Sequence, residues 1–284
     1  MSDVSALGWQ GKYKHDSPEV AELRERLAAE AGIAGVEVVD PAEPGYAEKA
    51  ARIFHRDGFV LVKDCLTPEK LERVRAAAAH TITEMVKHDP LRVGNRGSHR
   101  YCFANSFNHF GHCAEWALLI DPPPVLAVLE AIYGSPNFRL QGVGGDFVLP
   151  GCTQYQGLHR DFGDFLHDPS GRLDFRDLPP SEIAVNYPME VVEGSAVGHT
   201  PWNGVTRQIP GTQRSREAIP DLDSEPNWMK LSVTSPAPAG AAMIRDHRAW
   251  CATQARLPCL FAAQCPRAPP ADRAALNAVC VCVW

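Results

Sequence analysis

The stretch YQGLHRDF places a histidine and a carboxylate two residues apart, at His159 and Asp161. The stretch has the apolar texture of a buried strand, and on a strand residues i and i+2 point to the same face. An imidazole and a carboxylate side by side supply two of the three protein ligands of a non-haem Fe(II) site, whose other positions stay open. A hydrogen-bonded pair on the surface of a sheet has the same pattern, so the pair by itself leaves both interpretations open.

Nine cysteines are a second source of metal ligands, but their spacing does not favour a zinc site. No two of them have the CxxC spacing of a zinc knuckle, and Cys280 and Cys282 form a CxC. The N-terminal sequence MSDVSALGWQGKYKHDSPEV lacks the basic start and apolar block of a signal peptide. We therefore expect reduced thiols in a cytoplasmic protein.

The first half of the sequence predicts mainly helices, which belong to the framework that must position His159 and Asp161. Residues 46–57 form an amphipathic pattern that stops at Gly58, and the β-branched run FVLVKD that follows is predicted as a strand. A helix is predicted over 67–88, with Thr67 as its N-cap and apolar residues at intervals of three and four. The segment PPPVLAVLEAIYG is predicted as a further helix that ends at Gly134.

Strands dominate the later part of the sequence. The segments FRLQGVGGDFVLP, SEIAVNYPMEVV and NGVTRQIPG are short, rich in β-formers and separated by Gly, Pro, Asn and Asp. The segment AGAAMIRDHRAW, residues 239–250, is predicted as one late strand. This spacing predicts an antiparallel sandwich or barrel, and helices followed by strands predict an α+β fold with the helices outside a β core.

Composition excludes several classes of protein. At 284 residues with 45% hydrophobic content, the chain is long enough to bury a core. The net charge of -6 argues against a general nucleic-acid binder, which usually carries a basic face. No run of 18 apolar residues occurs, so no membrane span is expected. The sequence leaves the oligomeric state open.

Four motifs in order give the sequence a family resemblance. The stretches IFHRDGFVLVKDCLTPEKLERVR, LHRDF, NGVTRQIPGTQR and GAAMIRDHRAW resemble the phytanoyl-CoA dioxygenase family of Fe(II)/2-oxoglutarate-dependent oxygenases, over about residues 46–250. The resemblance implies a double-stranded β-helix (jelly roll, cupin-like) with flanking N-terminal helices. It also implies Fe(II), 2-oxoglutarate as co-substrate, O2, and hydroxylation of a small organic molecule.

The resemblance also assigns roles to individual residues. His159 and Asp161 correspond to the first two iron ligands, and Gln156 to a residue that lines the 2-oxoglutarate site. Gln141 and Asn186 lie where other members of the family contact the co-substrate. For Gln141 and Asn186, a polar strand residue without such a role is the alternative.

The sequence departs from the family after Trp250, where a histidine is expected as the third ligand and Cys251 stands instead. Three alternatives remain: Cys251 is the third ligand, there is no third ligand, or His247 is the ligand. His247 lies four residues from that position, which is about 13 Å along an extended strand. Sulfur would be a softer, charged donor in place of a neutral imidazole.

The arginine that the family places opposite the distal carboxylate of 2-oxoglutarate is also missing from its expected position. That position falls near Phe261 and Ala262, and the nearest arginines, Arg256 and Arg267, are out of step. Together with the cysteine at residue 251, this predicts an oxygenase whose activity is weak or absent.

We divide the chain into an N-terminal arm (1–44), a phytanoyl-CoA-dioxygenase-like domain (45–250) and an atypical C-terminal tail (251–284). The tail contains five of the nine cysteines, no glycine and a single acid, Asp272. A shifted reading frame, an alternative exon or a divergent C-terminus would each explain it. Two other functions compete with the oxygenase: an inactive jelly-roll homologue or isoform with a binding role, and a cupin-like protein with another metal.

Overall fold

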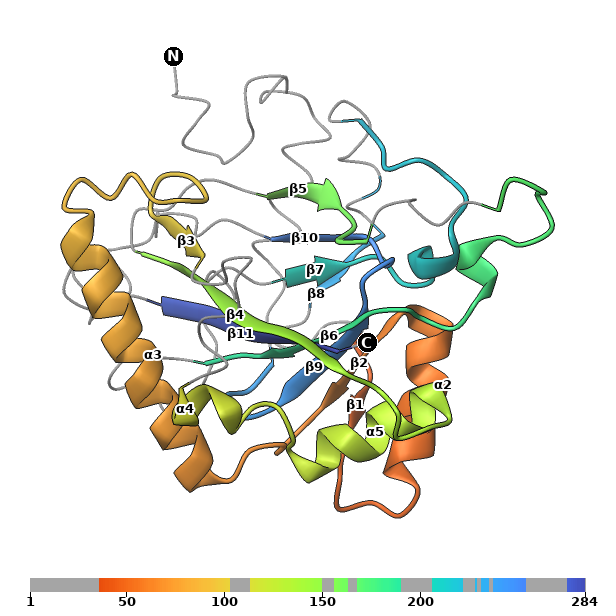
Figure 1. The fold of residues 1–284 in the computed structure, drawn as a ribbon, viewed down its shortest axis with the longest axis horizontal. Coiled ribbons are helices and arrows are strands. Elements are labelled where there is room, and N and C mark those ends of the chain that lie inside the picture. The colour runs from red at the N-terminus through yellow and green to blue at the C-terminus, as the bar shows by residue number, and fades with distance from the viewer. Residues whose placement is uncertain are drawn as a thin grey trace, which may run out of the picture.

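The protein, a computed structural model, consists of helices packed against two β-sheets (Figure 1). The structure describes residues 36–102, 113–149, 156–162, 168–189, 206–221, 228, 231–234, 237–253 and 275–283. The helices are α2 (Tyr46–Asp57), α3 (Pro68–His88), α4 (Ala114–Ala117) and α5 (Pro123–Tyr133), with short 3-10 helices η3 (Phe175–Asp177) and η4 (Thr212–Arg214). None of these described helices has the length and apolar content needed to cross a membrane.

The two sheets have seven and four strands. The larger sheet has the order β1 (Val38–Val39), β2 (Phe59–Val62), β9 (Ala242–Asp246), β6 (Ile183–Tyr187), β11 (Ala275–Val283), β4 (Leu140–Val148) and β3 (Arg100–Cys102). The smaller sheet has the order β5 (Gln156–His159), β10 (Cys251–Thr253), β7 (Thr206–Gln208) and β8 (Val233–Thr234). All described pairs are antiparallel except β1 with β2.

Local signals set the helix ends, as the sequence predicts. The Thr67 side chain accepts a hydrogen bond from the Lys70 backbone N–H at 3.3 Å, which satisfies one of the free donors at the start of α3. Gly58 and Gly134 follow α2 and α5 with φ of 87° and 65°, a left-handed conformation that favours glycine. The predicted helices over 46–57, 67–88 and the segment before Gly134 are therefore confirmed.

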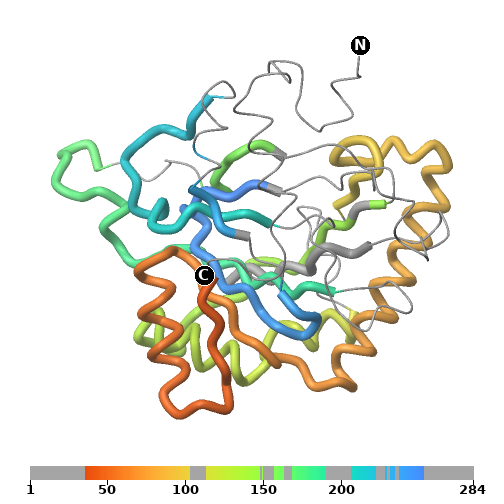
Figure 2. Tube along the Cα trace, turned by 180° about the vertical axis from the view of Figure 1, so that it is seen from behind, coloured from red at the N-terminus to blue at the C-terminus, as the bar shows by residue number. Residues whose placement is uncertain are grey.

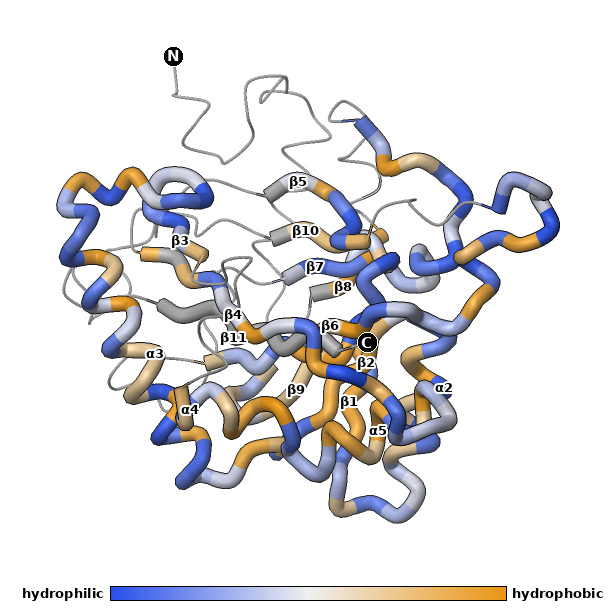
Figure 3. The backbone as a smooth tube through the Cα atoms, viewed as in Figure 1, coloured by the Kyte–Doolittle hydropathy of each residue, from blue (hydrophilic) through white to orange (hydrophobic). Residues whose placement is uncertain are grey.

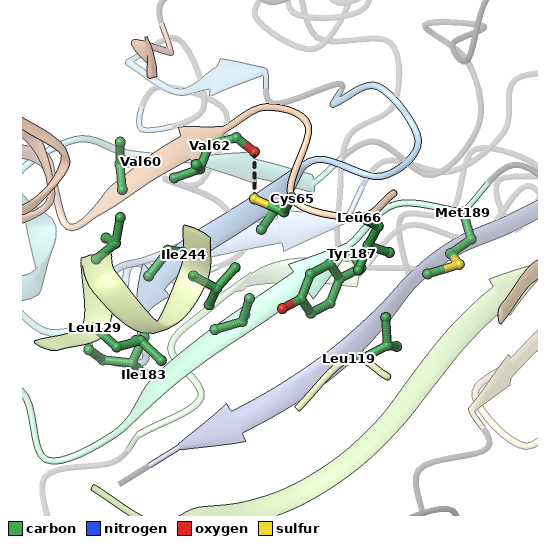
Figure 4. Packing of buried hydrophobic residues seen from close by; sticks show 14 of the residues in the cluster. Val60, Val62, Cys65, Leu66, Leu119, Leu129, Ile183, Tyr187, Met189 and Ile244 are labelled. Carbon is green, nitrogen blue, oxygen red and sulfur yellow. Dashed lines mark hydrogen bonds between the residues drawn. The ribbon is translucent and has the colours of Figure 1, made fainter. Parts of the chain in front are cut away.

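Alternation along the strands separates two faces of the larger sheet. Val60, Ile183 and Ile244 point to an outer face, where they pack with residues of α2, α3 and α5 in the main core (Figure 4). Figure 1 shows α2, α4 and α5 on the opposite side of the larger sheet from β5, β10 and β7, and Figure 3 colours β1, β2 and α5 mostly as hydrophobic. Phe59 and Met243 point to an inner face, which is turned toward the smaller sheet.

The late strand predicted over 239–250 is shorter in the structure, where β9 covers only Ala242–Asp246. β9 ends at Asp246 and β10 begins at Cys251 in the other sheet, so the chain turns a corner between them (Figure 2). The Arg248 guanidinium holds this corner, because it donates to the Asp246 carboxylate at 2.6 Å and to the Phe175 carbonyl at 2.8 Å. A prediction from periodicity missed the corner because the Phe175 carbonyl, which accepts from Arg248, lies 73 residues away in the sequence.

Both ends of the chain contribute strands. Val38–Val39, from the expected N-terminal arm, forms β1 at the edge of the larger sheet. Residues 251–253 and 275–283, from the expected tail, form β10 and β11, and β11 lies between β6 and β4. Among the cysteines whose side chains the structure describes, Cys65, Cys102, Cys113 and Cys251 form no disulfide bond.

Candidate metal centre

Three side chains that could hold a metal ion meet on the smaller sheet: His159, Asp161 and Cys251. The antiparallel pairing of β5 with β10 sets Cys251 directly opposite His159. The Cys251 Sγ lies 3.7 Å from His159 Nε2, and Asp161 Oδ1 lies 3.3 Å from the same nitrogen. One ligand atom from each residue lies within 4.8 Å of the other two. The structure thus brings together residues that are 92 positions apart in the sequence.

The imidazole of His159 is oriented by its own strand. Its Nδ1 lies 2.8 Å from the Gly157 carbonyl oxygen, which can only accept a hydrogen bond. Donation from Nδ1 leaves Nε2 facing Asp161 and Cys251, where the deprotonated ring would offer its lone pair to a metal. A histidine that binds a metal is normally held in this way through its second ring nitrogen.

Asp161 follows β5 and is held by the corner between β9 and β10. Its backbone N–H donates to the His247 carbonyl at 3.1 Å. The Arg245 guanidinium donates to Asp161 Oδ2 at 2.5 Å, which leaves Oδ1 turned toward His159. One carboxylate oxygen is therefore engaged by a cation, and the other faces the candidate metal position.

Arg245 is a site residue that the sequence reasoning missed. It lies on the inner face of β9, and its Nε donates to Asn186 Oδ1 at 2.9 Å while its Nη1 approaches Cys251 Sγ at 3.8 Å. Together with the bond to Asp161, the guanidinium connects β9, β6, β10 and the loop after β5. The sequence did contain a signal for Arg245, because this arginine lies within the mostly apolar run AMIRD. A charged side chain that is buried with its strand requires polar partners, so a role in a buried polar site could have been predicted.

The charges of the site shift two pKa values. Burial alone would raise the pKa of Asp161, but the Arg245 guanidinium and the hydrogen bond with His159 hold this pKa well below its usual range. Burial alone would lower the pKa of His159, but the adjacent Cys251 sulfur and the Asp161 carboxylate raise it to about 11. Without a metal, the cluster therefore favours a protonated imidazole beside an ionised carboxylate.

The other residues singled out from the sequence lie around this cluster or outside the described residues. Asn186 lies on β6 and contacts Arg245, whereas Gln141 lies exposed on β4. Gln156 opens β5, and its side chain is outside the described part of the structure. The His247 imidazole bonds to Glu182 Oε2 at 2.8 Å, apart from the three candidate ligands. Phe261, Ala262, Arg256 and Arg267 also lie outside the described residues.

The donor set is suited to a divalent transition metal. A ring nitrogen, a carboxylate oxygen and a sulfur lie within 4.8 Å of one another, and three protein ligands would leave the remaining coordination positions of an ion open to other ligands. The sulfur distinguishes this set from the two-histidine, one-carboxylate triad of non-haem iron oxygenases. His159 and Asp161 are of residue types found in that triad, and Cys251 lies beside them.

Several solved structures share the fold of this chain. No family model and no curated protein matches the sequence. The epimerase SnoN in complex with Fe3+, alpha ketoglutarate and nogalamycin RO superposes with a TM-score of 0.55 at 16% identity, over 85% of this chain and 84% of that chain. AviO1 from Streptomyces viridochromogenes Tue57 gives 0.53 at 16% identity, over 83% and 93% of the two chains.

HygX from Streptomyces hygroscopicus, with nickel, 2-oxoglutarate and hygromycin B bound, gives a TM-score of 0.55 at 10% identity, over 83% of this chain and 86% of that chain. At these identities the likeness concerns the fold. This chain therefore shares its fold with SnoN and HygX, whose structures hold a metal ion together with alpha ketoglutarate or 2-oxoglutarate.

Proposed function

We propose that this protein is an Fe(II)/2-oxoglutarate-dependent oxygenase of the phytanoyl-CoA dioxygenase type, built on a double-stranded β-helix. The observation that carries the proposal is the convergence of His159, Asp161 and Cys251, with ligand atoms within 4.8 Å of one another. The shared fold with SnoN and HygX supports it. The proposed substrate is a small organic molecule, and the protein is proposed to act in the cytoplasm, without nucleic-acid or membrane partners.

In this proposal His159 Nε2, Asp161 Oδ1 and Cys251 Sγ hold the ion. A ferrous ion with 2-oxoglutarate supplies the oxidation of a substrate C–H bond by O2, coupled to decarboxylation of the co-substrate to succinate. The protein orients the imidazole through the Gly157 carbonyl and the carboxylate through Arg245. Both contacts fix ligand geometry before an ion arrives.

Cys251 sets the level of activity that we expect. A thiolate adds a negative charge to the site and favours softer metals than a second imidazole does. We therefore propose that the natural chain turns over slowly, and that Cys251→His, which restores the two-histidine triad, raises turnover.

Succinate release from 2-oxoglutarate, measured with Fe(II) and O2, tests this function. We expect the release to be lost in His159→Ala and increased in Cys251→His. The exposed thiol Cys113 provides the control variant Cys113→Ala, which should behave like the natural chain. Succinate release that persists unchanged in His159→Ala would contradict the proposal.

A binding protein without turnover is the second candidate. It is favoured by the cysteine at residue 251 and by Phe261 and Ala262 at the expected arginine position. Metal binding without succinate release, in both the natural chain and Cys251→His, would favour this candidate over the oxygenase. A metal other than iron in the purified protein would favour the cupin-like alternative.

A further inference from the structure

Gln208 lies in the same row as two of the candidate metal ligands. On β10, Cys251 pairs with His159 of β5 on one side and with Gln208 of β7 on the other. Directly paired residues of antiparallel strands project to the same face of a sheet. The side chain of Gln208 therefore shares a face with the imidazole and the sulfur.

The amide of Gln208 is buried without a hydrogen-bond partner. The residue is 0% exposed, and neither Nε2 nor Oε1 has a partner among the described residues. Its neighbour Arg207 is equally buried, but its Nε donates to Ser232 Oγ at 2.7 Å. A buried amide that makes no hydrogen bond destabilises a fold and is rare in natural proteins. An apolar side chain at residue 208 would avoid this penalty, which points to a role outside folding.

The distance from the cluster indicates which part of a ligand Gln208 would meet. Two strand spacings separate β7 from β5, which places the Gln208 and His159 backbones about 10 Å apart. Gln208 would therefore contact the far end of a molecule bound to the ion rather than the atoms on the ion. The next residue in the row is apolar, because Val233 of β8 pairs with Gln208 and packs against the hydrophobic cluster that contains Met243.

The charge near this row favours an anion. Arg245 Nη1 lies 3.8 Å from Cys251 Sγ, so its positive charge is close to the residue that separates Gln208 from His159. An anionic group at the far end of a ligand would meet the amide N–H of Gln208 within the field of this guanidinium.

We propose that Gln208 recognises the distal carboxylate of a 2-oxo acid whose 2-oxo end binds the ion, with Nε2 as the donor. This inference depends on the proposed function, because it names a residue that would select the co-substrate. Gln208 sets the required length and terminal charge of the co-substrate, since its amide is the last polar group before Val233 in the row across β5, β10, β7 and β8.

The experiment compares Gln208→Met with the natural chain. Methionine has similar length and no amide, so the variant should unfold at the same or a higher temperature than the natural chain when no ligand is present. Affinity for Fe(II) alone should not change. Affinity for 2-oxoglutarate, titrated with Fe(II) under nitrogen and followed by the shift in unfolding temperature, should fall about tenfold.

A second ligand separates the carboxylate from the rest of the molecule. 2-Oxopentanoate has the same five-carbon chain without the distal carboxylate. The natural chain should prefer 2-oxoglutarate to 2-oxopentanoate, and Gln208→Met should lose about tenfold of that preference.

Gln213 provides a matched control, because it is also buried but its Nε2 donates to the His55 carbonyl at 3.2 Å. Gln213→Met should lower the unfolding temperature and keep the preference for 2-oxoglutarate. If Gln208→Met keeps the full preference, or fails to fold, the inference is overturned and the proposed function stands. If the natural chain binds Fe(II) but neither 2-oxo acid, the proposed co-substrate fails, and the inference fails with it.

Discussion

The Arg245 guanidinium donates to the carboxylate of Asp161 at 2.5 Å, across 84 residues of sequence. This contact joins the larger sheet, through β9, to the loop that follows β5 of the smaller sheet. The same guanidinium reaches Asn186 and Cys251, so the position of the candidate ligands depends on one cation from the opposite sheet.

Arg245→Met should destabilise the protein and weaken metal binding. The substitution removes the cation beside Asp161. Because the Asp161 side chain is 32% exposed, the expected loss in the free energy of unfolding is about 2 kcal/mol, which is less than for a fully buried ion pair. Loss of a partner that orients a ligand should also lower metal affinity by about 10-fold to 100-fold. Urea unfolding and metal titration measure the two effects.

Arg245→Lys is the control, because it keeps the charge but has one ammonium in place of the planar fork that meets Asp161, Asn186 and Cys251 together. We expect it to keep part of the stability and to lose metal affinity. Equal metal affinity in all three proteins would show that the guanidinium does not orient the site.

Cys251→His should change which metal the site prefers. Sulfur favours soft or borderline ions such as Zn²⁺, whereas imidazole also suits iron, so the ratio of Zn²⁺ to Fe(II) affinity should fall in the variant. Competition titrations with the two ions, under nitrogen, measure this ratio. Cys113→His, at an exposed thiol, should leave the ratio unchanged. An unchanged ratio in Cys251→His would mean that residue 251 is not a ligand.

Gly58→Ala should destabilise the protein more than Gly134→Ala. Both glycines have positive φ, which costs an alanine about 1–2 kcal/mol. At Gly58 an added Cβ would also lie 2.7 Å from Gln213 Oε1 and 3.2 Å from Ala249 Cβ, whereas at Gly134 it would meet nothing within 4 Å. Urea unfolding of both variants measures the difference. Equal losses would indicate that the corner around Gly58 adjusts freely.

Asp89 should stabilise the loop before β3 only above acidic pH. Its carboxylate accepts from the Gly94 N–H and the Tyr101 hydroxyl, each at 2.8 Å, and these bonds lower its pKa. A lowered pKa in the folded state gives stability that is present above the unfolded value of about 3.9 and is lost as the pH falls below it. Asp89→Asn should therefore reduce the free energy of unfolding at pH 7 and have less effect at pH 3.

Tyr101 gives an independent readout of the same contact. Burial and the hydrogen bond to Asp89 raise the pKa of Tyr101 to about 12, so its stabilising effect is complete below pH 10 and is lost as the pH rises toward 12. Ultraviolet titration of the phenol should show this pKa, and Asp89→Asn should move it toward 10. A Tyr101 pKa that stays near 12 in the variant would assign the shift to burial alone.

The sequence by itself determined the local elements and part of the site. Thr67 at the N-cap and glycines after two helices act over a few positions, so the ends of α2, α3 and α5 were predictable. The proximity of His159 and Asp161 was predictable from their spacing of two residues, but β5 ends at His159 and Asp161 lies in the segment after it, not on the strand.

Only the tertiary structure decided what surrounds that pair. Strand pairing set Cys251 and Gln208 in one row with His159, and the corner after Asp246 allowed Arg245 to reach Asp161 from another sheet. Register and corners depend on contacts between segments far apart in the chain, and no pattern within one segment carries that information.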